Sequence, residues 1–186
     1  MYRGSDAKNK NEVLERAMTV TEKAHGKGSA HWGQRSVDIG VKMLGKSTLK
    51  RSKELIAQGH QTLTETIGAD STRVHYAALQ LGKVELALGN TKNAVKLLTS
   101  TVESTSNGEP SSRKIELAAR ELLIQGLERQ GKRDDATVHL QVLAKAKANG
   151  EPVSKGAIVK AKPKTPSIEA AKKGGKVTVS YDVNEE

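Results

Sequence analysis

One segment of the sequence has the spacing of a nucleotide-binding loop. Residues 40–47 read Gly-Val-Lys-Met-Leu-Gly-Lys-Ser and satisfy the pattern GxxxxGK[ST], in which backbone N–H groups and the lysine hold phosphates. Such a loop must follow a buried strand, whereas residues 36–44 have the apolar spacing of a helix. No strand ending in Asp follows to help hold a magnesium ion. We therefore interpret Gly40 as a helix-packing residue and predict no cofactor-binding residues.

The histidines and acids are the other candidates for chemistry. His25 and His31 flank a glycine turn beside Trp32, but two histidines without further ligands make a weak metal site, so we favour packing roles. The chain has no cysteine and no GxSxG motif, and Asp134 and Asp135 stand where carboxylates stabilise a helix start. We predict no catalytic residues, no bound metal and no enzymatic activity.

The positive charge of the chain is concentrated near its C-terminal end. Lys and Arg number 31 against 21 Asp and Glu, a formal net charge of +10. Residues 149–175 contain six lysines, two acids and no aromatic side chain on which bases could stack. We interpret this stretch as a solvated spacer with weak, salt-sensitive affinity for anions, and we do not expect nucleic acid as the main partner.

The elements that position these residues are helices. Hydrophobic residues make up 35% of the chain, aromatic ones only 2%, and Phe is absent, so any core is built from Leu, Ile, Val and Ala. Apolar residues recur at helical spacing through the first 148 residues, and Gly, Asn and Pro separate the runs. This pattern predicts a mainly α array of antiparallel helical hairpins with helices near residues 10–25, 30–44, 49–67, 71–88, 91–105, 110–130 and 133–148.

The helices repeat with a step of 42 residues. The second unit has a large aliphatic residue and a small one in its first helix, a glycine in the turn, and a small residue and a large aliphatic one in its second helix. The third unit has Ile124 at the small position of its first helix, and the first unit has Ser47 at the position of the turn glycine. The small residues let the two helices approach closely, and the turn glycine supplies the positive φ that ends the first helix. The repeat-defining residues are Ile39, Gly40, Leu81, Gly82, Gly89, Ala94, Leu98, Leu123, Gly131, Ala136 and Leu140. The first unit keeps Ile56 but has Ser52 in place of alanine.

The unit from Leu81 to Leu98 resembles a tetratricopeptide repeat, because its Leu-Gly pair, turn glycine, alanine and large apolar residue follow that family's order and spacing. The resemblance covers about residues 30–148, and the longer step implies longer helices or loops. It implies a superhelix in which the first helix of each hairpin lines a concave face that holds a protein or peptide. On that basis we expect ligand contacts from Arg35, Asp38, His75, Gln80 and Lys83.

The C-terminal residues have a different character. Residues 149–175 hold three of the four prolines and read as an extended linker, and residues 176–186 alternate apolar and polar side chains like a strand. Residues 166–186, with Ala170, Ala171 and Gly175, resemble the opening of a TonB C-terminal domain, the energy-transducer module. That resemblance implies a chain cut at the first strand of that domain, whose absent part would contact an outer-membrane transporter. Any membrane attachment would come through segments absent here.

These observations predict three regions: a repeat domain in residues 1–148, the linker in residues 149–175, and the start of a TonB-like domain in residues 176–186. The expected function is a non-enzymatic protein–protein interaction scaffold in the periplasm or cell envelope. The alternative is a cytoplasmic adaptor or a nucleic-acid-associated protein that uses the basic tail.

Overall fold

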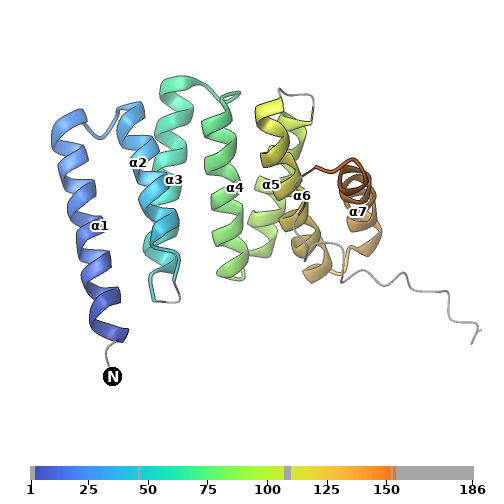
Figure 1. The fold of residues 1–186 in the computed structure, drawn as a ribbon, viewed down its shortest axis with the longest axis horizontal. Coiled ribbons are helices and arrows are strands. Elements are labelled where there is room, and N and C mark those ends of the chain that lie inside the picture. Colours follow the sequence, from blue (N-terminus) through green and yellow to red (C-terminus); the bar gives the residue numbers. More distant parts are fainter. Residues whose placement is uncertain (1–2, 46, 107–109, 152, 154–186) are drawn as a thin grey trace, which may run out of the picture.

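The protein is mainly helical in the part that the computed structural model describes, residues 3–45, 47–106, 110–151 and 153. The helices lie side by side in chain order (Figure 1). They are α1 (Arg3–His25), α2 (Ala30–Lys42), α3 (Leu49–Ile67), α4 (Thr72–Ala87), α5 (Thr91–Thr105), α6 (Pro110–Arg129) and α7 (Arg133–Ala148).

The predicted helices are confirmed, with one difference at the N-terminal end. Helices α2 to α7 begin and end within about two residues of the expected positions. Helix α1 begins at Arg3 instead of near residue 10. Residues 4–12 contain no large apolar side chain, so apolar spacing could not detect the helix there. The predicted strand in residues 176–186 and nearly all of the predicted linker lie outside the described residues.

Glycines shape the first two hairpins as the repeat predicted. A Cβ atom at Gly40 of α2 would lie 2.6 Å from Ile56 Cγ1 of α3, and one at Gly82 of α4 would lie 2.7 Å from Leu98 Cδ2 of α5. These are the same two repeat positions, one step of 42 residues apart, so both hairpins use the same close contact. The turn glycines Gly89 and Gly131 have φ values of +81° and +74°, in the left-handed region that ends a helix.

The third hairpin keeps the repeat positions without the glycine contact. Ile124 of α6 stands where Gly40 and Gly82 stand in the other hairpins, and it is buried. Leu140 of α7 is half-buried against the apolar cluster that contains Ile124, whereas Ala136 of α7 is fully buried in that cluster.

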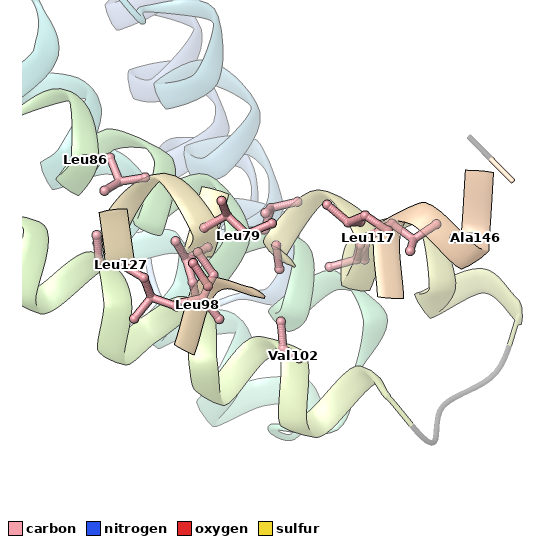
Figure 2. Packing of buried hydrophobic residues seen from close by; sticks show 14 residues of the cluster. Leu79, Leu86, Leu98, Val102, Leu117, Leu127 and Ala146 are labelled. Carbon is pink, nitrogen blue, oxygen red and sulfur yellow. The ribbon is translucent and has the colours of Figure 1, made fainter. Parts of the chain in front are cut away.

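The core is aliphatic, as the composition predicted. Its largest cluster joins α4, α5, α6 and α7, and Figure 2 labels Leu79, Leu98, Leu117 and Ala146, one from each of these helices. A second cluster joins α1, α2 and α3 around the single tryptophan, Trp32, which is 2% exposed. The helices are therefore held as one continuous stack by contacts between neighbours.

Ion pairs supplement the core at two places. Arg51 of α3 forms a bidentate ion pair with Glu15 of α1, with N···O distances of 2.7 and 2.9 Å. The buried carboxylate of Glu85 in α4 forms an ion pair with Lys53 of α3, with an N···O distance of 2.9 Å, and accepts a hydrogen bond from Asn90 Nδ2 at 2.6 Å. Both links join neighbouring units.

A larger charge network lies where α6 meets α7 and the residues after it. Buried Glu116 accepts hydrogen bonds from Arg113 at 2.7 Å and from Arg120 at 2.9 Å. Arg113 also binds Glu151, with an Nε–Oε2 distance of 2.6 Å, and Arg120 reaches His139 of α7 at 3.0 Å. Because Glu151 follows α7, this network ties the end of α7 to α6.

Among the described residues, no helix combines the length and the apolar character that a membrane span requires.

Candidate ligand-binding face

Alternate helices form two layers that pack differently. The backbone of helix α4 comes close to the backbones of both α2 and α6, whereas the backbones of α3, α5 and α7 do not come close to one another in the described helices. We call the side formed by α2, α4 and α6 the inner face of the array.

Helices α2 and α4 each leave one polar stripe uncovered. In α2 and α4 the exposed or half-buried positions recur at spacings of three and four residues, which places them on one helix face. The stripe of α2 contains Arg35 and Asp38, and that of α4 contains Arg73, Gln80 and Lys83. This part of the inner face therefore presents more positive than negative side chains.

Four of the five residues expected to contact a ligand reach this face. Arg35 and Lys83 are exposed, and Asp38 and Gln80 are half-buried. The Asp38 carboxylate accepts a hydrogen bond from Gln34 Nε2 at 3.0 Å, which holds the acid along α2.

The fifth expected contact, His75, does not reach the face. Its side chain lies inside the stack with the residue 7% exposed, and neither ring nitrogen has a hydrogen-bond partner among the described residues. Helix α4 packs against α2, α3, α5 and α6, so only a narrow stripe of it stays open, and His75 lies outside that stripe. The expectation of a ligand contact from His75 was wrong.

Tyr76 is a face residue that the sequence reasoning missed. It is half-buried beside two core clusters, and burial together with the nearby Asp38 carboxylate raises the pKa of its phenol above the ordinary value. Tyr76 of α4 therefore lies near Asp38 of α2. The sequence could have indicated this position, because Tyr76 is the only aromatic residue in α4 apart from the histidine. It also follows Gln34, a polar residue of α2, by one repeat step.

The segment with the spacing of a nucleotide-binding loop has another geometry. Gly40 lies within α2 against Ile56, and α2 continues to Lys42. The Thr48 hydroxyl donates to the carbonyl oxygens of Met43 and Gly45, which closes a tight turn before α3. The segment thus joins two helices, whereas a phosphate-binding loop joins a strand to a helix.

The paired histidines meet at the corner between α1 and α2. The rings of His25 and His31 stack with their centroids 4.7 Å apart, and the Lys27 ammonium lies 5.8 Å from the Trp32 ring centroid. In the described part of the chain, no group of three or more side chains of the metal-binding types comes together. Asp134 and Asp135 lie in the first turn of α7, as predicted, where the helix dipole favours carboxylates.

Comparison with models of known protein families returned no match to this chain, and comparison with characterised proteins returned none either.

Proposed function

We propose that this chain is a non-enzymatic, tetratricopeptide-like scaffold whose inner face holds a protein or peptide ligand. The supporting observation is the packing of α4 against α2, since it brings the polar stripes of these two helices onto one side. A peptide lying across that side would meet Arg35, Asp38, Tyr76, Gln80 and Lys83. Their mixture of charge, amide and phenol suits recognition of a polar main chain with some acidic side chains.

A cell-envelope setting belongs to the same proposal. It rests on the resemblance of residues 166–186 to the opening of a TonB C-terminal domain, a stretch outside the described residues. In that setting the repeats would gather one partner while the C-terminal module contacts an outer-membrane transporter.

Selection of displayed random peptides on the purified chain tests the inner face. The enriched peptides are then measured against two variants of equal charge change. One variant carries Arg35→Glu and Lys83→Glu on the inner helices, and the control carries Lys50→Glu and Lys96→Glu, which are exposed on α3 and α5. We expect the inner-face variant to lose about tenfold or more in affinity and the control to lose less than about twofold.

Two results would contradict the proposal. Equal binding to both variants would move the ligand site away from the inner face, and a selection that enriches no peptide would remove the scaffold role.

The nucleic-acid alternative predicts a different result. Labelled single-stranded RNA would bind with a steep dependence on salt, and deletion of residues 151–175 would abolish that binding.

A further inference from the structure

Toward α6 the inner face becomes apolar. Ala118 of α6 follows Tyr76 of α4 by one repeat step and is half-buried. Leu122 follows Gln80 by the same step and is half-buried as well. Tyr76, Ala118 and Leu122 all pack against the cluster that joins α4, α5, α6 and α7, and α4 packs against α6. We call the surface formed by these three side chains the apolar patch.

Next to the apolar patch, on α2, lies a carboxylate without a cationic partner. Burial and the charge of Asp38 together raise the pKa of the Tyr76 phenol, so the carboxylate lies near the patch. Asp38 is half-buried and accepts a hydrogen bond from Gln34 Nε2 at 3.0 Å. It forms no ion pair with any lysine or arginine in the part of the chain that the structure describes. Because a carboxylate can accept about four hydrogen bonds, most of this capacity is open to a ligand.

The carboxylate and the apolar patch together select a ligand with matching side chains. Partial burial lowers the local dielectric constant, so Asp38 attracts a cation more strongly than a fully exposed acid does. A large apolar side chain gains free energy when it leaves water for the patch. An arginine or lysine near a large apolar residue therefore complements this part of the inner face, whereas an acidic residue beside Asp38 would be repelled.

The spacing of the inner helices sets the spacing of the two ligand side chains. Packed helices lie about 10 Å apart, and the apolar patch spans α4 and α6. The middle of the patch is therefore about one and a half helix spacings from α2, or about 15 Å. An extended chain rises about 3.4 Å per residue and points alternate side chains to the same side. Residues four positions apart match this separation.

We propose that the inner face binds an extended peptide segment in which a basic residue pairs with Asp38 and a large apolar residue four positions away covers the apolar patch. This inference rests on the proposed scaffold function and specifies the ligand of the same face. Asp38 selects for positive charge, and Leu122 selects for a large apolar side chain.

Peptide selection on three forms of the full chain tests the role of Asp38. The probe is a displayed library of random peptides, applied to wild type, to Asp38→Lys and to Glu103→Lys, whose substituted acid is exposed on α5. We expect wild type and Glu103→Lys to enrich peptides with arginine or lysine four positions from a large apolar residue. Asp38→Lys should enrich an acidic residue at the basic position and keep the apolar one.

Affinities of one enriched peptide test both contacts. Fluorescence anisotropy of the labelled peptide should show binding about tenfold or more weaker with Asp38→Lys, and a glutamate in place of the peptide's basic residue should restore it. Leu122→Ser should weaken binding by a similar factor, whereas Val138→Ser, at a residue of α7 that is 60% exposed, should leave it unchanged. Circular dichroism checks that the variants fold, and Leu122→Ala replaces Leu122→Ser if the serine variant does not.

The outcomes separate this inference from the scaffold proposal. Suppose that the enriched peptides bind through Arg35 and Lys83 but lack the basic and apolar pair, or bind Asp38→Lys or the Leu122 variant as tightly as wild type. The inference would then be wrong, and the scaffold proposal would stand. A selection that enriches no peptide would remove both.

Discussion

The two helices of the first hairpin and the two helices of the third are held together by different kinds of contact. Between α2 and α3 the backbones come close, because Gly33, Gly40 and Gly59 leave room where side chains would otherwise stand. Hydroxyl groups cross this narrow gap: Ser36 Oγ donates to the Leu55 carbonyl oxygen at 2.8 Å, and Ser52 Oγ donates to the Gly40 carbonyl oxygen at 2.6 Å. The close fit of the two backbones therefore determines how α2 and α3 pack.

Between α6 and α7 a polar link supplements the apolar contacts. Ile124 replaces the glycine, so the backbones need not approach as closely, and Arg120 connects Glu116 of its own helix to His139 of α7. The same repeat position can therefore hold a glycine, which allows close backbone contact, or a larger side chain combined with a polar link between the helices. It also predicts different weaknesses: side-chain volume in the first hairpin, and charge and pH in the third.

Truncating the large aliphatic residue of each second helix should give the largest contrast. Ile56 is fully buried, so Ile56→Ala should lower the free energy of unfolding by about 3 kcal/mol. Leu140 is half-buried, so Leu140→Ala should cost only about 1 kcal/mol. Urea denaturation followed by circular dichroism measures both. Equal losses would mean that the two hairpins are packed alike.

Adding one methyl group tests the close approach in the first hairpin. A Cβ at Gly59 would lie 2.6 Å from the Gly33 carbonyl oxygen and 3.0 Å from Val37 N, and backbone atoms cannot move aside. We expect Gly59→Ala to destabilise the protein by about 2 kcal/mol, even though alanine favours the helix.

Gly126→Ala is the matched control for Gly59→Ala. The added Cβ would lie 2.7 Å from Val95 Cγ2, a side-chain atom, so no backbone atom has to move. The free energy of unfolding should fall by only about 1 kcal/mol, because the side chain can adjust in part and alanine favours the helix. A loss at Gly126 as large as that at Gly59 would rule out backbone proximity as the cause.

Much of this fold follows from local rules. Apolar spacing and turn glycines such as Gly89 and Gly131 predicted where helices begin and end, because those features act within a few residues. The repeat step predicted that small residues bring the paired helices close together, and the structure shows this at Gly40 and Gly82. The start of α1 escaped detection because its first turns carry no large apolar side chain.

The candidate site was less predictable, because exposure depends on how many helices surround a residue. His75 is a polar residue of the inner helix α4. Four neighbouring helices pack against α4 and cover the side on which His75 lies. The Arg113 and Glu116 pair could be expected from its spacing of three residues along a helix. The bond from Arg113 to Glu151 could not, because it depends on the path of the chain after α7.

Removing the central charge of the third hairpin should have an intermediate effect. Glu116→Gln keeps the size of the side chain but leaves Arg113 and Arg120 without a carboxylate between them, so we expect a loss of about 1.5 kcal/mol. Glu103→Gln, at an exposed position of α5, should change the free energy of unfolding by less than about 0.5 kcal/mol. If both variants unfold at the wild-type urea concentration, the network does not hold this hairpin.

Acidification should produce the smallest effect, centred on His139. Burial, and then the positive charge of Arg120, lower the pKa of His139 below its ordinary value of 6.5, while Asp135 opposes the shift. Because Arg120 can only donate, its 3.0 Å contact requires His139 Nδ1 to accept, so the ring is neutral in the folded protein. Burial also lowers the pKa of His60.

The unfolded chain, whose histidines have ordinary pKa values, therefore binds more protons than the folded one below about pH 6.5. The stabilisation is fully present above that pH and is lost as the pH falls through the lowered pKa of the folded state. We expect the urea midpoint to fall between pH 7.5 and pH 5, a range above the lowered carboxylate pKa values of Glu15 and Glu151. His139→Gln should remove part of this fall and His60→Gln another part. A midpoint that falls equally in wild type and His139→Gln would show that protonation of His139 does not weaken the α6–α7 link, and the contrast between the two hairpins would then rest on side-chain volume alone.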